Sequence, residues 1–368
     1  MAAYTAIDDP GEYFNTVVFT GDVVDGDGTY HDQAVTGVGF APDLLWHKGV
    51  TGARPHYTVD SVRGQGGSPT QMLHLSSYNT SADNTTNTNG QIKSLDSDGW
   101  TAVSGNDSSS RANNSCANGE KYVGWCWKAG TTGSGTTTGS GTGKAYSYSV
   151  STTAGFSIVK WLGNGSSGHT IPHHLGAVPQ VVIMKNRDNA ITWIVGHKKA
   201  AFTNILFLDT TSAATDDANA FADTDPTSTV WTMGTGNGGN DDDVNYVGYA
   251  FAEKQGYSKF GSYVGNSDAD GTFVYLGFRP AFVMIKATSG GEGWYMVDNK
   301  RQGFNPENEE LFAQDGAAEG TSNRIDLLSN GFKLRDNNSL VNSSSITSYI
   351  YMAFAEAPFV NSNGVPCN

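Results

Sequence analysis

Short apolar runs recur along this chain, and three of them have the same polar boundaries. Each begins with Gly-x-x-Pro and ends on a lysine six residues after the proline. Runs rich in Val, Ile and aromatic residues, bounded by Gly, Asn, Asp and Ser, predict β-strands. Proline suits the first residue of a strand, and glycine the turn before it. The equivalent positions are Gly39, Pro42 and Lys48; Gly176, Pro179 and Lys185; and Gly277, Pro280 and Lys286.

The similarity extends to both sides of these runs. An aromatic residue, any residue and glycine precede each copy, and an aromatic-rich run closes it, at 122–127, 246–251 and 349–354. Such a series of landmarks in one order predicts an internal triplication. Each copy spans roughly 100 residues with several short strands, which is the size of a β-sandwich. We therefore expect an all-β fold of three tandem homologous β-sandwich modules, jelly-roll-like in form.

The predicted boundaries follow these landmarks. They are an N-terminal arm at 1–11, repeat one at 12–129, a Gly/Ser/Thr linker at 130–144, repeat two at 145–256, repeat three at 257–360 and a C-terminal tail at 361–368. The composition of the linker predicts a flexible coil. Repeats two and three meet at 254–257 with almost no linker. We therefore expect repeat one to be set apart, with repeats two and three packed together.

The three equivalent lysines are candidates for a ligand contact in each repeat. The alternative, which we favour, is a lysine that ends an apolar strand, points to solvent and discourages edge pairing. A second class of candidate is the exposed aromatic residues on loops, which could stack on sugar rings. The sequence does not identify which of them are exposed.

Other polar clusters are weaker candidates. Four histidines could act as a pH switch or metal ligands, but repeats one and three lack counterparts, and solvated turns and strands are the favoured interpretation. The acidic clusters lack a complete calcium-loop pattern and are interpreted as solvated turns. The histidines are His169, His173, His174 and His197, and the acidic clusters are Asp25 and Asp27, Asp216–Asp217, and Asp241–Asp243.

Catalytic motifs are poorly represented. Gly234, Gly236 and Gly239 match a dinucleotide fingerprint in spacing, but three aspartates and a strand-like run follow instead of the helix that the motif requires. No Gly-x-Ser-x-Gly or His-Glu-x-x-His occurs. We expect no catalytic residues, no cofactor and no metal site, and hence no enzyme.

The cysteines number three, at 116, 126 and 367, so they cannot form a closed set of disulfides. Cys126 occupies the position of Ala250 and Ala353 in the closing runs and is best interpreted as a small core residue. A bridge between Cys116 and Cys126 remains an alternative.

The net charge of −14, from 36 acidic and 22 basic residues, argues against nucleic acid as a partner. No apolar stretch is long enough for a transmembrane helix, and the first ten residues lack the pattern of a secretory signal. We expect synthesis in a cytoplasm and no membrane insertion.

The residues of the repeat also carry a family resemblance. The segments 3–10, 60–64, 329–335 and 349–358, with the Gly-x-x-Pro units, resemble β-repeat proteins of tailed phages of marine bacteria. Such proteins are described as tail-fibre-like or virion structural proteins, and no catalytic residues are known for them. Repeat two departs from the pattern, with Gly196–Lys198 in place of Asp60–Gly64.

The resemblance implies a virion structural protein. It would be a fibre, an adhesin or a capsid decoration that contacts other virion proteins and host glycans, with a homotrimer favoured. The alternatives are an array of carbohydrate-binding modules and, less favoured, a polysaccharide depolymerase.

Overall fold

The computed structural model describes residues 4–24, 30–66, 71–84, 88–107, 110–236, 238–301, 305, 307–346 and 348–367. The predicted all-β class is confirmed. The described residues contain many antiparallel strands, two 3₁₀ turns and one α-helix of four residues. In this part of the chain no helix has the length and apolar character needed to cross a membrane.

The strands follow the chain in three groups. Repeat one has a 3₁₀ turn, η1 (Pro10–Glu12), then β1 (Phe14–Thr20), β2 (Asp32–Thr36), β3 (Leu44–Gly49), β4 (His56–Asp60), β5 (Gln65–Gly66), β6 (Gln71–Met72), β7 (Gln91–Asp96), β8 (Gly99–Val103) and β9 (Lys121–Trp127). The predicted linker and repeat two have β10 (Thr131–Thr136), β11 (Thr138–Gly139), β12 (Ala145–Ser151), β13 (Phe156–Leu162), β14 (His169–Pro172), β15 (Val181–Asn186), β16 (Ile194–His197), η2 (Lys198–Ala200), β17 (Asn204–Phe207), β18 (Thr215–Asp216), α1 (Ala218–Phe221), β19 (Val230–Met233) and β20 (Asn245–Phe251). Repeat three has β21 (Ser258–Tyr263), β22 (Phe273–Tyr275), β23 (Phe278–Ala287), β24 (Tyr295–Asp298), β25 (Glu307–Phe312), β26 (Gly320–Leu328), β27 (Gly331–Leu334) and β28 (Tyr349–Pro358).

The same strand order recurs in each repeat. The inner sheets read β1-β9-β3-β4, β13-β20-β15-β16 and β21-β28-β23-β24. In every case the closing run pairs with the first strand on one side and with the Gly-x-x-Pro strand on the other. A second layer pairs β2 with β8, β14 with β19 and β22 with β27.

The Gly-x-x-Pro turns have the backbone that the sequence predicts. Gly39, Gly176 and Gly277 have φ of 86°, 66° and 82°, a left-handed conformation in which a side chain would be strained. The strands that follow, β3, β15 and β23, are buried along almost their whole length. They are buried on both faces because each inner sheet lies between two hydrophobic cores.

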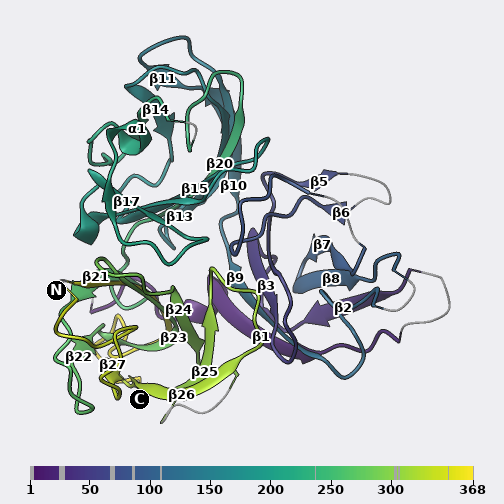
Figure 1. Ribbon diagram of the computed structural model, residues 1–368, viewed down its shortest axis with the longest axis vertical. Helices are drawn as coiled ribbons and strands as arrows, with labels where there is room; N and C mark the ends of the chain where they lie inside the picture. Colours follow the sequence, from purple (N-terminus) through teal and green to yellow (C-terminus); the bar gives the residue numbers. More distant parts are fainter. Residues whose placement is uncertain are drawn as a thin grey trace.

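Three of these cores lie inside the repeats and one is shared. The shared core contains residues of β1, β3 and β9 from repeat one, β13, β15 and β20 from repeat two, and β21, β23 and β28 from repeat three. At its centre are the equivalent rings of Trp127, Phe251 and Phe354, with centroids 5.5 to 6.4 Å apart. The repeats therefore form three lobes around a pseudo-threefold axis (Figure 1).

This arrangement corrects the predicted separation of repeat one. The repeat contributes Phe14, Trp46 and Trp125 to the shared core. The predicted flexible coil is also wrong for most of its length, because β10 pairs along its full length with β12. Gly133 and Gly135 in β10 leave room for the rings of Tyr148 and Tyr146 that lie across them. The glycines thus serve close packing rather than flexibility.

Both chain ends pack near repeat three (Figure 1). In the N-terminal arm, Ala6 N donates to Gln255 O at 2.9 Å, and Ile7 is buried in the shared core. Asp8 accepts hydrogen bonds from the backbone and hydroxyl of Ser362 in the C-terminal tail. The arm is therefore part of the folded body.

Candidate functional site

The lysines at the ends of the three central strands are buried, not solvated as predicted. Lys48, Lys185 and Lys286 have no exposed surface. Each Nζ donates to one or two carbonyl oxygens of its own repeat, at most six residues along the chain, and to a loop of the adjacent repeat. The oxygens belong to Gly49, Gly316 and Ala317 for Lys48; to Asn186, Ile191 and Thr80 for Lys185; and to Glu292 and Thr211 for Lys286.

These contacts close a cycle. The lysine of repeat one bonds to repeat three, the lysine of repeat three bonds to repeat two, and the lysine of repeat two bonds to repeat one. In each repeat a second side chain contacts the same neighbouring repeat as the lysine does. His56 Nε2 lies 3.1 Å from Asp315 O, Trp193 Nε1 donates to Ser76 O at 2.9 Å, and Trp294 Nε1 donates to Phe207 O at 2.8 Å. The lysines therefore hold the three repeats together and are not ligand contacts.

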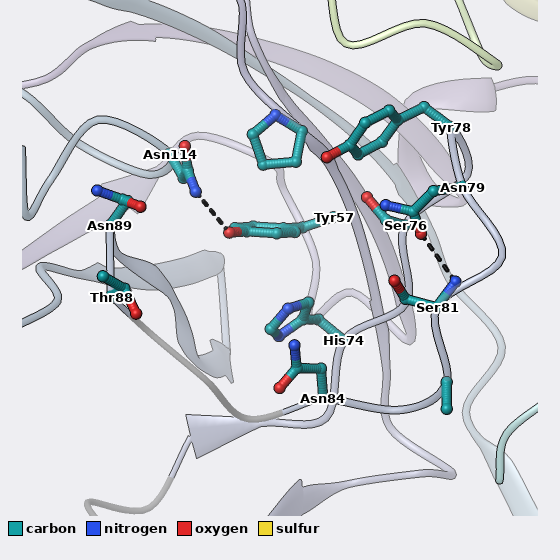
Figure 2. Close-up of a pocket in the computed structure, with 12 residues that line it drawn as sticks. Tyr57, His74, Ser76, Tyr78, Asn79, Ser81, Asn84, Thr88, Asn89 and Asn114 are labelled. Atoms are coloured by element: carbon teal, nitrogen blue, oxygen red, sulfur yellow. Dashed lines mark hydrogen bonds between the residues drawn. The ribbon is translucent and has the colours of Figure 1, made fainter. Parts of the chain in front are cut away.

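The register identifies His56 as the counterpart of Trp193 and Trp294. In repeat one His56 lies opposite Lys48, while in repeat three the pairing of Ile285 with Tyr295 places Trp294 opposite Lys286. In the sequence, Tyr57 is the aromatic residue that opens the next apolar stretch of repeat one, as Trp193 and Trp294 do in the other two repeats. Tyr57 instead points to a pocket on the other side of β4 (Figure 2).

The histidines serve the structure. Three of the four are buried, which corrects their predicted solvation: His169 bonds to Asn240 and Thr137, His173 to Thr227 O, and His197 to Tyr351 O. His174 stacks on Tyr148 with centroids 3.7 Å apart. They lie in separate hydrogen-bond networks, and the described residues contain no group of three or more His, Cys, Asp or Glu able to hold a metal ion.

The remaining predicted candidates lie on turns or in the core. Asp217 caps α1, and Asp243 pairs with Lys144. Gly234 and Gly236 donate backbone hydrogen bonds to the α1 segment, so they allow close packing and precede no helix. Cys126 is a buried thiol in the core of repeat one, as predicted. Asp25 and Asp27 lie outside the described residues.

A pocket in repeat one has the features of a binding site. It has a volume of about 290 Å³ and opens between β4 and the segment that follows His74. Its lining residues are aromatic rings, amides and hydroxyls: Pro55, Tyr57, His74, Ser76, Tyr78, Asn79, Ser81, Ala82, Asn84, Thr88, Asn89 and Asn114. Among the described residues that line it there is no carboxylate, lysine or arginine.

Hydrogen bonds fix the floor of the pocket. Asn114 Nδ2 donates to the Tyr57 hydroxyl at 2.8 Å, and the Tyr57 ring lies against His74 with centroids 4.4 Å apart (Figure 2). The backbone of His74 pairs with Asn84. The floor is therefore formed before any ligand arrives, which reduces the entropy lost on binding.

The loop at the rim is anchored to both neighbouring repeats. Lys185 donates to Thr80 O, Ser77 Oγ donates to Ala313 O at 2.6 Å, and Asp83 N donates to Arg187 O at 2.8 Å. The cycle of lysine contacts thus holds one wall of the pocket in place.

Burial makes the pocket electrically neutral. It raises the pKa of Tyr57 above its ordinary value, and it lowers the pKa of His74 to about 4, with Arg63 adding to that effect. His74 Nδ1 is buried without a hydrogen-bond partner in the described part of the chain. At neutral pH the imidazole is uncharged, so His74 adds no charge to the pocket.

This site is not evident from the sequence. The sequence signal for the site is the segment 76–90, which is dense in Asn, Ser and Thr. Composition alone does not separate such a segment from an ordinary surface loop. The convergence with Tyr57 and Asn114 appears only in the folded chain.

Comparison with known proteins identifies the family. A protein-family model described as Domain of unknown function (DUF7483) matches residues 9–358. The chain belongs to the DUF7483 family. The match includes all three repeats, so a DUF7483 domain corresponds to the whole three-lobed body and not to one repeat. No curated protein and no solved structure matches this chain.

Proposed function

We propose that this DUF7483 protein is a non-enzymatic virion protein, a tail adhesin or capsid decoration, that binds neutral saccharides in the pocket of repeat one. The observation that supports binding is the lining of that pocket. Asparagine amides and serine hydroxyls both donate and accept hydrogen bonds, as sugar hydroxyls require. The rings of Tyr57 and Tyr78 offer apolar surface to a sugar face.

The same lining favours binding over cleavage. Glycoside hydrolysis usually requires two carboxyl groups on either side of the scissile bond. The described residues of this pocket supply none. A bound saccharide would therefore be held without an acid or a nucleophile beside it.

The virion assignment is supported by the sequence resemblance and by the architecture. A body with three lobes, one shared core and a surface low in charge suits display on a particle. The chain also contains within itself the threefold arrangement that a homotrimer would supply. Native mass spectrometry separates a chain of 39.0 kDa from a trimer of such chains.

The binding proposal is tested with a glycan array, followed by calorimetric titration of a neutral oligosaccharide that scores on it. Tyr78→Ala removes an aromatic wall of the pocket, and we expect affinity to fall at least about tenfold. Tyr30→Ala removes an exposed tyrosine of the same repeat outside the pocket and should leave affinity unchanged. Binding by Tyr78→Ala equal to the wild type, or no binding of any neutral glycan, would exclude the pocket as the site.

The location is tested by imaging purified particles with gold-labelled antibody. We expect label at the tail tip or over the capsid surface. Particles without the protein would refute the virion assignment while leaving the saccharide titration valid.

A further inference from the structure

A second groove lies where repeat two meets repeat one. It has a volume of about 400 Å³ and is formed at the ends of neighbouring strands of one sheet. Its lining residues are Ala145, Tyr146 and Ser147 of β12, Lys160, Trp161 and Leu162 of β13, Arg187 after β15, and Asn245 of β20. The pocket of repeat one shares none of these residues.

A chain of ion pairs crosses the junction beside the groove. Arg63 Nε lies 2.5 Å from the Asp60 carboxylate, Arg63 Nη1 lies 2.7 Å from Asp83, and Arg187 Nε lies 2.6 Å from the other oxygen of Asp83. Two carboxylates and two guanidinium groups compensate one another. These four side chains therefore carry no net charge before Lys160 is counted.

Lys160 adds a positive charge that this network does not neutralise. It is half-buried, and no hydrogen bond or ion pair to its Nζ occurs in the described part of the chain. Burial and, after it, the nearby Arg187 lower the pKa of Lys160, against the attraction of Asp60 and Asp83. An ammonium group in such a place is stabilised by an anion that approaches from the groove.

The surroundings favour an anion that also carries hydroxyl groups. Ser147 lies directly opposite Lys160 in the β12–β13 register, and Asn245 of β20 also lines the groove. Asp188 is a further carboxylate near the groove, and it accepts hydrogen bonds from the backbone and side-chain N–H groups of Asn245. We propose that this groove binds the carboxylate of an acidic saccharide, with Lys160 and Arg187 facing the charge and Ser147 and Asn245 facing the hydroxyls.

Calorimetric titration of the full-length protein with trigalacturonate at low salt tests the proposal. We expect saturable binding that weakens with added salt and falls at least about tenfold in Lys160→Gln. Lys198→Gln removes the same charge from an exposed lysine of repeat two and should bind as the wild type does. The fully methyl-esterified trisaccharide should bind at least about tenfold more weakly than the acid, because its charge is lost.

The outcomes separate this groove from the neutral pocket and from a simple anion site. Tyr78→Ala should retain full affinity for trigalacturonate. Equal affinities of Lys160→Gln and the wild type would overturn the proposal, as would displacement of trigalacturonate by an equal concentration of inorganic sulfate. Thermal melting of Lys160→Gln checks that the variant is folded.

Discussion

Trp125 Nε1 donates a 3.0 Å hydrogen bond to the Asp298 carboxylate, joining the closing strand of repeat one to repeat three. Asp298 also accepts from Arg301 Nε at 2.7 Å. The junction of repeats two and one has the same form, since the Tyr249 hydroxyl donates to Asp60 at 2.8 Å. The third junction instead uses the imidazole of His197. The three junctions are equivalent in position and different in chemistry.

Removing the acid at the first junction should be costly. Among the described residues, Asp298→Ala leaves the buried guanidinium of Arg301 with Glu319 as its one ion-pair partner. We expect a loss of about 3–5 kcal/mol in the free energy of unfolding. Trp125→Phe removes a hydrogen bond and little volume, and should cost about 1–3 kcal/mol. Urea denaturation measures both. Equal losses for the two variants would show that the ion pair is not the main contribution of Asp298 to the free energy of unfolding.

The shared core predicts that the three repeats unfold together. Phe354→Ala truncates one of the three rings at the axis and should lower the free energy of unfolding by about 3–5 kcal/mol while a single calorimetric transition remains. Phe332→Ala, inside the core of repeat three, is the matched control for a lost ring away from the axis. Separate transitions for the repeats in the wild type would contradict the prediction.

The buried lysines predict stability that rises with pH. Burial lowers the pKa of Lys185 to about 8, whereas an unfolded lysine titrates near 10.4. Between these values the unfolded chain binds more protons than the folded one, so stability increases with pH by up to about 1.4 kcal/mol per unit. Lys185→Met should lose that part of the increase, as measured by urea denaturation at pH 7.5 and pH 9.5. Lys198→Met, at an exposed position, should retain it, and parallel profiles for Lys185→Met and the wild type would refute the assignment.

The buried histidines predict sensitivity to mild acid. Burial lowers the pKa of His74, His173 and His197 to about 4. As the pH falls from 6.5 towards 4, the unfolded chain takes up protons that the folded chain excludes, so stability is lost. Each histidine contributes up to about 1.4 kcal/mol per pH unit. His197→Gln should reduce the slope of stability against pH in this window by one such contribution, and an unchanged slope would count against it.

The sequence predicts the strands well because they depend on local residues. The turn at Gly176 and Pro179, and the apolar run from Val181 to Met184, specify a strand buried on both faces. Cys126 could be placed in a core because its position matches Ala250 and Ala353. These inferences need only the pattern within one repeat or the alignment of the three repeats, and not the way the repeats pack.

Contacts between repeats cannot be predicted from these sequence patterns. Whether Lys48 meets solvent or the carbonyl groups of Gly316 and Ala317 depends on how the first and third repeats pack. Whether Thr131–Thr136 forms a strand or a flexible coil depends on the free edge of β12, with which this glycine-rich segment pairs. The pocket beside Tyr57 was hidden for the same reason, since its rim is fixed by repeats two and three.

Fusion of the three lobes into one chain has an evolutionary consequence. In a trimer of identical chains, every substitution appears three times, so a new recognition surface must be compatible with all copies at once. Here a mutation alters one lobe alone, while Trp127, Phe251 and Phe354 maintain the common centre. The long loop beside Tyr57 and the groove at Lys160 are therefore free to diverge independently.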